Sequence, residues 1–337
     1  MDSARLPLAL AATRDWNAHH LDVKSAFLNG ELTEMGVCAA ATWVRRCRRR
    51  RQDSTLVTLE FKKCASEHAL YTRRSKEGIL IVGVYVDDSI ITGSEQQEIG
   101  RQGKHAIELC QSAYALKLLE RAGLKGCNPT QVPMQEKPKL SKNSADEKVD
   151  ATLYRSLIGG LRYLTHTRPD ISFCGIWSCE LGLAYPRRKK ISDLHLIGFS
   201  DSDMGGDLDG RKSTSGMVFF LETCPISWQS QKQKIVALST CEAEYIAGAA
   251  AACQGVWLRR LLEEITGQIV AAPILRIDNH SAIELAKNPV LHSHSKHNDI
   301  KFHFIRDCVE KRQVILEQVG TSQQLADVFT KPLGLRR

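Results

Sequence analysis

The last third of the chain carries a regular succession of short apolar segments and helical patterns. LHLIGFSD, SGMVFFLE and PISWQSQ predict three strands, and a short loop at Thr223 and Cys224 joins the last two. A long helix is expected from about Thr240 to Ile265, ended by Gly267. After it, the sequence predicts a strand, two helices, a fifth strand and a final helix, in the segments ILRID, HSAIELAKN, HNDIKFHFIRDCVEK, VILEQV and SQQLADVF.

This order of elements limits the possible folds of the segment strongly. Three strands, a helix, a strand, helices, a strand and a helix give the element order of the ribonuclease H fold. A chain of this kind forms a mixed five-stranded sheet with helices on both faces, because each apolar face must be covered. The fold class is therefore α/β (α+β).

Four acidic residues lie at the ends or near the starts of these elements: Asp201, Glu244, Asp278 and Asp327. Carboxylates gathered from separate strands and helices are what a two-metal phosphodiester hydrolase needs. Mg²⁺ prefers near-octahedral oxygen ligands, and two ions about 4 Å apart can stabilise both the attacking and the leaving oxygen. We therefore expect two Mg²⁺ or Mn²⁺ ions at these residues.

Two of the four positions have a competitor close by. Asp203 lies in the same segment as Asp201, but the end of the first strand favours Asp201 as the metal ligand. Glu242 competes with Glu244. Because Ser239 and Glu242 have capping-box spacing, the amides at the start of the helix can occupy Glu242. The carboxylate that stays available for a metal is then Glu244.

The other two positions have ordinary structural alternatives. Asp278 precedes Asn279 and could cap the next helix, although a carboxylate at a strand end beside a helix start also suits a metal site. Asp327 could be a surface residue of the closing helix. Four histidines nearby suggest a zinc site: His292, His294, His297 and His303. Because no cysteine lies at zinc-site spacing from them, we expect no zinc. A proton shuttle is a better role for His297 than a zinc ligand, because imidazole suits general acid chemistry.

A second acidic motif lies near the N-terminus. ILIVGVYVDDSIITGS predicts a strand–turn–strand hairpin with Asp87 and Asp88 at its tip. Asp22 follows His19, His20 and Leu21 as the end of another strand would. Together Asp22, Asp87 and Asp88 would hold two Mg²⁺ ions for nucleotidyl transfer.

The Tyr-Val-Asp-Asp motif with an upstream Asp resembles the polymerase palm of reverse transcriptases. Six blocks in order resemble the pol region of a Ty1/copia-type retrotransposon: DVKSAFLNG, YVDDSIITGS, LYRSLIGGLRYLTHTRPDI, DGRKSTSG, STCEAEYIA and QLADVFTKPL. The resemblance implies a truncated reverse transcriptase palm over 1–95, a truncated thumb and connection remnant with a linker over 96–190, and a ribonuclease H domain over 191–337. It also implies cleavage of the RNA strand of RNA–DNA hybrids.

The chain departs from this family around the polymerase site. The block that shapes the dNTP pocket is missing between Asp22 and Asp87, and the fingers region is expected to be absent. The segments after Gly100 and between Cys174 and Leu194 are short. Because a polymerase positions its substrates within fractions of an ångström, we expect that activity to be lost. The alternative for the whole chain is a catalytically dead retroelement relic, at most a basic nucleic-acid-binding protein.

Charge gives weaker information about partners. The 337 residues suit about two domains, and the net charge is +8, which favours a polyanionic partner only slightly. The arginine run over 45–51 would be a nucleic-acid patch or, as we favour, a solvated loop. An RNA–DNA hybrid would be recognised through its minor groove and its 2′-hydroxyls. Five residues are candidate contacts to it: Lys212, Ser213, Thr214, Lys232 and Lys234.

Composition also bears on location. The sequence contains no stretch of 18 uncharged apolar residues, so no membrane span is predicted. The N-terminal segment is typical of an amphipathic helix and not of a signal peptide. The 11 cysteines include no C-x-x-C pair, which indicates a reduced, intracellular chain in the cytoplasm or nucleus. The sequence does not indicate an oligomeric state.

Overall fold

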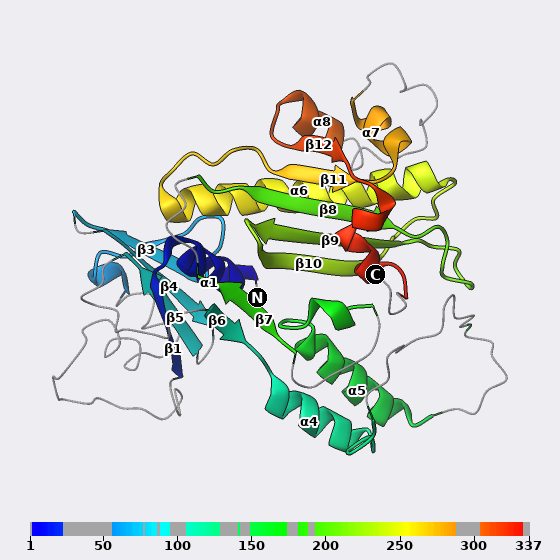
Figure 1. The fold of residues 1–337 in the computed structure, drawn as a ribbon, viewed down its shortest axis with the longest axis horizontal. Coiled ribbons are helices and arrows are strands. Elements are labelled where there is room, and N and C mark those ends of the chain that lie inside the picture. Colours follow the sequence, from blue (N-terminus) through cyan, green and yellow to red (C-terminus); the bar gives the residue numbers. More distant parts are fainter. Residues whose placement is uncertain are drawn as a thin grey trace.

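The structure is a computed structural model, and two larger sheets dominate it (Figure 1). It describes residues 2–22, 56–76, 78–85, 88–94, 106–128, 141, 149–173, 181–187, 193–287 and 304–332. Each of the two larger sheets has five strands, and a two-stranded sheet accompanies them.

The N-terminal sheet is antiparallel throughout, in the order β1-β5-β4-β3-β2. Its strands are β1 (Asn17–Asp22), β2 (Lys62–Lys63), β3 (Leu70–Arg74), β4 (Ile79–Tyr85) and β5 (Asp88–Gly93). β4 and β5 are the two strands of the hairpin predicted from the sequence, and β3 pairs with β4 as a third strand. Ile81 pairs with Thr92 near its centre, where both side chains are buried.

The C-terminal sheet is mixed, in the order β10-β9-β8-β11-β12. β8, β9 and β10 are antiparallel neighbours, whereas β8, β11 and β12 run parallel. Their bounds are β8 (Leu196–Ser202), β9 (Thr214–Leu221), β10 (Cys224–Lys232), β11 (Ile274–Ile277) and β12 (Ile315–Gln318). The predicted five-stranded mixed sheet of ribonuclease H type is therefore confirmed.

Apolar side chains alternate between the two faces of this sheet, as the two-residue period of a strand requires. Phe219 and Leu221 face the long helix α6 (Thr240–Thr266), and Phe199 and Val218 pack against the closing segment on the opposite face. α6 begins at its Ser239 cap and ends at Gly267, whose φ of 70° is readily adopted by glycine. The shorter helices are α7 (His280–Lys287) and α8 (Phe304–Glu310).

The closing segment differs from the predicted α-helix. It forms two 3₁₀ turns, η4 (Thr321–Gln323) and η5 (Leu325–Phe329). The side chain of Gln324 accepts a hydrogen bond from the amide of Ala326 and so begins η5. Asp327 then accepts from the amide of Thr330 at 3.1 Å, in the tighter spacing of a 3₁₀ turn.

Two helices project away from the sheets as a hairpin (Figure 1). They are α4 (Ser112–Arg121) and α5 (Ala151–Leu164). Asp150 caps α5 by accepting a hydrogen bond from the amide of Thr152. The turn η1 (Pro169–Ile171) follows, and β6 (Ala106–Leu109) pairs with β7 (Leu183–Pro186).

One hydrophobic core joins the two larger sheets. It contains Leu6 and Leu10 of the first helix, Ile81 of β4, and Phe219 and Leu258 of the C-terminal sheet and α6. The first helix, α1 (Asp2–Arg14), is buried continuously from residue 5 to residue 13. The expectation of an amphipathic helix is therefore wrong, because α1 contacts strands of both sheets and has no long solvent face.

Candidate metal centre at the end of the C-terminal sheet

The parallel strands β8 and β11 place two carboxylates side by side. Ile277 pairs with Ser200, so Asp278, directly after β11, and Asp201, the next residue of β8, lie at the same edge of the sheet. Ligands of open α/β sheets bind outside this carboxyl edge of parallel strands. Asp201 is 1% exposed and Asp278 is half-buried.

The third carboxylate comes from the first turns of α6. Oε1 of Glu244 accepts a hydrogen bond from the amide of Ser202 at 3.0 Å, which ties the helix to the end of β8. Ligand oxygens of Asp201, Glu244 and Asp278 all lie within 4.8 Å of one another. Oε2 of Glu244 is buried and receives no hydrogen bond from any described group.

The two competing acidic residues have other partners. Oε2 of Glu242 accepts a hydrogen bond from the amide of Leu238 at 2.8 Å, and the Ser239 hydroxyl accepts from the amide of Glu242. Glu242 thus caps its own helix. The carboxylate of Asp203 accepts a hydrogen bond from the amide of Thr214 and holds the loop between β8 and β9.

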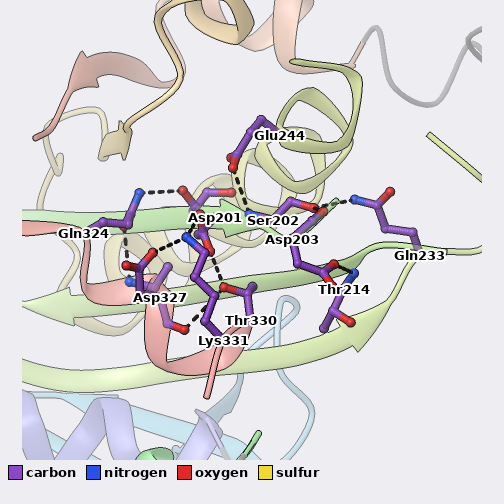
Figure 2. A network of polar contacts seen from close by, with 12 residues as sticks. Asp201, Ser202, Asp203, Thr214, Gln233, Glu244, Gln324, Asp327, Thr330 and Lys331 are labelled. Carbon is purple, nitrogen blue, oxygen red and sulfur yellow. Dashed lines mark hydrogen bonds and ion pairs between the residues drawn. The ribbon is translucent and has the colours of Figure 1, made fainter. Parts of the chain in front are cut away.

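The fourth carboxylate, Asp327, lies on η5 beside Asp201 (Figure 2). Nζ of Lys331 lies 2.7 Å from Oδ1 of Asp327 and 3.2 Å from Oδ1 of Asp201. The hydroxyl of Thr330 donates to Oδ2 of Asp201. The closing segment therefore contributes one carboxylate and two hydrogen-bond donors to the site.

Close packing on β9 holds the closing segment in place. A Cβ atom at Gly216 would lie 2.7 Å from Cβ of Phe329 and 2.8 Å from Cγ2 of Thr330. Gln324 also donates to the carbonyl of Ser200 at 2.9 Å. Gly216, Thr330 and Lys331 are not among the site residues predicted from the sequence. The TKPL letters after Asp327 were a signal for the last two.

Burial and like charge make ionisation of this cluster unfavourable. Burial raises the pKa of Glu244, and the negative charges of Asp201 and Asp278 raise it further. Burial and Asp201 likewise raise the pKa of Asp278, although Lys331 opposes this. Burial lowers the pKa of Lys331, but the hydrogen bond to Asp327 and the charge of Asp201 outweigh it, so that its pKa is raised.

The residues suit a hard divalent cation. The cluster offers carboxylate oxygens, which are the ligands that Mg²⁺ and Mn²⁺ prefer. A buried carboxylate oxygen without a donor, such as Oε2 of Glu244, costs free energy unless a cation or proton compensates it. Asp201, Glu244 and Asp278 would hold such an ion, and Asp327 lies beside them.

Only part of the predicted polymerase site falls within the described residues. The backbone register of β1 and β5 pairs Asp22 with Asp88, as expected for a palm hairpin beside a neighbouring strand. Asp87 lies outside the described residues. The proton-shuttle candidate His297 also lies outside them, as do the other three histidines of its segment and the arginine run.

The five candidate nucleic-acid contacts lie on or around β9 and β10. Ser213 is fully buried and accepts a hydrogen bond from the amide of Gly205, so it cannot reach a ligand in this structure. Lys232 pairs with Asp207 at 3.0 Å, and Lys234 is exposed. The other two, Lys212 and Thr214, are half-buried.

The sheet order and the acidic cluster define a protein of the ribonuclease H-like class, carrying an additional antiparallel sheet at its N-terminal end. By sequence, the chain is homologous over 98% of its length to Pol polyproteins of copia-type retrotransposons. No family model matches it.

Three of its relatives are plant retrotransposon polyproteins. The retrovirus-related Pol polyproteins from transposons RE1 and RE2 of Arabidopsis thaliana are both 32% identical, and that from transposon TNT 1-94 of Nicotiana tabacum is 31% identical. The chain spans only 27% to 31% of their lengths. The alignment with RE1 has 407 positions and the chain has 337 residues, so at least 70 positions of RE1 face a gap.

Solved structures with a partial likeness include two nucleic-acid enzymes. The N-terminal ribonuclease H domain of Rv2228c from Mycobacterium tuberculosis has 15% identity and a TM-score of 0.30, covering 41% of this chain and 91% of that one. A foamy viral protease–reverse transcriptase in complex with RNA/DNA hybrid has the same identity and TM-score, covering 96% of this chain and 46% of that one. None of the described helices combines the length and apolar character that crossing a membrane requires.

Proposed function

We propose that this chain is a retrotransposon reverse transcriptase/ribonuclease H segment whose C-terminal half hydrolyses the RNA strand of RNA–DNA hybrids. The observation that carries the proposal is the convergence of Asp201, Glu244 and Asp278 from two strands and one helix. Such convergence is costly for carboxylates unless a cation joins them. In an endonuclease of this class, the bound metal ion would offset the repulsion between the carboxylates.

The chain's own residues would each do a definite part of this chemistry. Mg²⁺ or Mn²⁺, as two ions in the active complex, would supply Lewis acidity and orient the attacking water when bound. The amide of Ser202 holds Glu244 towards Asp201. The register of β8 and β11 fixes Asp201 against Asp278. His297 is proposed to carry a proton to the leaving oxygen.

The polymerase half is proposed to be inactive. The gaps of at least 70 positions relative to RE1 support this, as do the missing residues of the dNTP pocket. The shared core gives the N-terminal sheet a structural role, because the sheet contacts α1 and Arg74 of β3 donates a hydrogen bond to the carbonyl of Glu264 near the end of α6. We accordingly propose the division into 1–95, 96–190 and 191–337 as an evolutionary one.

The proposed partner is an RNA–DNA hybrid in an intracellular setting. Lys212, Thr214, Lys232 and Lys234 stay candidates for its backbone, as cations there would neutralise phosphates. Lys232 and Lys234 are the two exposed residues among them. No zinc is part of the proposal, because the histidines have no cysteine partners at zinc spacing.

The test is cleavage of a labelled RNA–DNA hybrid by the full chain with Mg²⁺ or Mn²⁺. Asp278→Asn should abolish cutting while the circular dichroism spectrum is unchanged. Asp193→Asn, an exposed position before β8, is the matched control and should cut normally. If the folded wild-type chain does not cut, the proposal fails and the non-catalytic relic is the better description.

A further inference from the structure

The ammonium group of Lys331 occupies one side of the acidic cluster. It bridges Oδ1 of Asp327 at 2.7 Å and Oδ1 of Asp201 at 3.2 Å (Figure 2). Both carboxylates are nearly fully buried, with side chains 3% and 1% exposed. A cation between two buried carboxylates offsets repulsion that the interior cannot screen.

The other side of the cluster has no such cation among the described residues. Oε2 of Glu244 is buried without a donor, although ligand oxygens of Asp201 and Asp278 lie within 4.8 Å of the Glu244 carboxylate. Asp201 thus lies between two halves of the acidic cluster, one with Asp327 and Lys331 and the other with Glu244 and Asp278. In one half its negative charge is balanced by Lys331, and in the other half it faces two further carboxylates.

The backbone also directs Lys331 into this position. Lys331 follows Asp327 by four residues, and its amide donates to the Asp327 carbonyl at 2.9 Å. The preceding Thr330 donates to the second oxygen of Asp201. The Lys331 side chain remains 36% exposed, so its long stem can withdraw towards solvent, which the buried carboxylates cannot do.

We propose that Lys331 takes the place of the second divalent cation in the chain without substrate, a reading that rests on the proposed function. Asp201, Glu244 and Asp278 then hold one ion. A second ion, which would use Asp201 and Asp327, is excluded until the ammonium withdraws. Lys331 is therefore a positioning residue that sets the number of bound metal ions.

The experiment is a Mn²⁺ titration of the full chain, followed by calorimetry and by the electron paramagnetic resonance signal of free Mn²⁺. Wild type and Lys331→Arg should each bind one ion. Lys331→Met removes the charge and should bind two. Lys311→Met is the matched control, because Lys311 forms the same four-residue pair with Asp307 on an exposed surface; it should bind one ion.

If the Lys331→Met variant does not fold, Lys331→Gln removes the same positive charge and tests the same prediction. An equal number of ions in wild type and in the neutral variant would overturn the inference. Two ions in a wild-type chain that still cuts hybrid would overturn it and leave the proposed hydrolysis intact. A folded chain that neither binds Mn²⁺ nor cuts hybrid would refute the proposed function as well.

Discussion

The guanidinium of Arg5 lies 3.6 Å from the ring centre of Trp228, which stacks the first helix on the edge strand β10. The Asp2 carboxylate pairs with Arg5 and accepts a hydrogen bond from Ser227 at 2.9 Å. Trp257 of α6, which lines the same cavity as Arg5 and Trp228, donates to the carbonyl of Ser66 at 3.0 Å. Residues 191 to 225 positions apart therefore hold the two sheets as one unit.

Arg5→Ala should lower the free energy of unfolding by about 3 kcal/mol. It removes a desolvated cation–π contact and leaves Asp2 without its cation. Because the core is shared, chemical denaturation followed by tryptophan fluorescence and by circular dichroism should give one coincident transition at a lower midpoint.

The control for this change is Arg260→Ala, at an exposed position of α6, which should alter the free energy of unfolding by less than about 0.5 kcal/mol. Two separate transitions in the wild-type chain would show that the sheets unfold independently. In that case the C-terminal half alone would be a suitable enzyme for cleavage assays.

Gly216→Ala should displace the closing segment from β9. The added Cβ would lie within 3.0 Å of Cβ of Phe329, Cγ2 of Thr330 and the carbonyl oxygen of Ala326. Overpacking of this kind costs about 2 kcal/mol, which thermal melting measures. Gly320→Ala is the matched control, since nothing lies within 4 Å of its Cβ position. Equal melting temperatures for the two variants would contradict this account.

Local patterns predicted the sheet and part of the site. Alternating apolar residues define β9 and β10, and the capping relationship between Ser239 and Glu242 separates Glu242 from Glu244 by spacing alone. These features depend on residues a few positions apart. Their physical causes, strand periodicity and helix capping, can therefore be recognised in a sequence.

Other features depend on contacts between distant segments. Lys331 reaches Asp201 only because the closing segment packs over Gly216, more than 100 residues earlier. The continuous burial of α1 likewise comes from two sheets on opposite sides, which no helical period encodes. The 3₁₀ form of η5 follows from a cap by Gln324, whose partners only the fold supplies.

Glu242→Gln and Glu244→Gln should differ sharply in metal response. Glu242→Gln weakens a helix cap and should cost about 1 kcal/mol, while Mn²⁺ still raises the melting temperature. Glu244→Gln leaves the cap intact and replaces an unfavourably placed carboxylate, so the metal-free chain should melt higher and lose its response to Mn²⁺. Thermal melts with and without Mn²⁺ check both. An unchanged Mn²⁺ shift in Glu244→Gln would remove that residue from the metal site.

Stability of the metal-free chain should fall as pH rises. Burial, together with Asp201 and Asp278, raises the pKa of Glu244 above its ordinary value of 4.5. At a pH between 4.5 and the raised pKa, Glu244 keeps a proton in the native state that it has released in the unfolded chain. By linkage the free energy of unfolding therefore decreases with rising pH until the raised pKa is passed. Asp278 adds to the same trend, because burial and Asp201 raise its pKa too.

Melting temperatures in EDTA should accordingly fall between about pH 5 and about pH 8. Saturating Mg²⁺ should reduce or reverse that slope, because the ion requires ionised carboxylates and releases their protons. Glu244→Gln has no proton to lose at this position and should flatten the EDTA series. If its slope equalled that of wild type, the pH dependence would have to come from groups outside the acidic cluster.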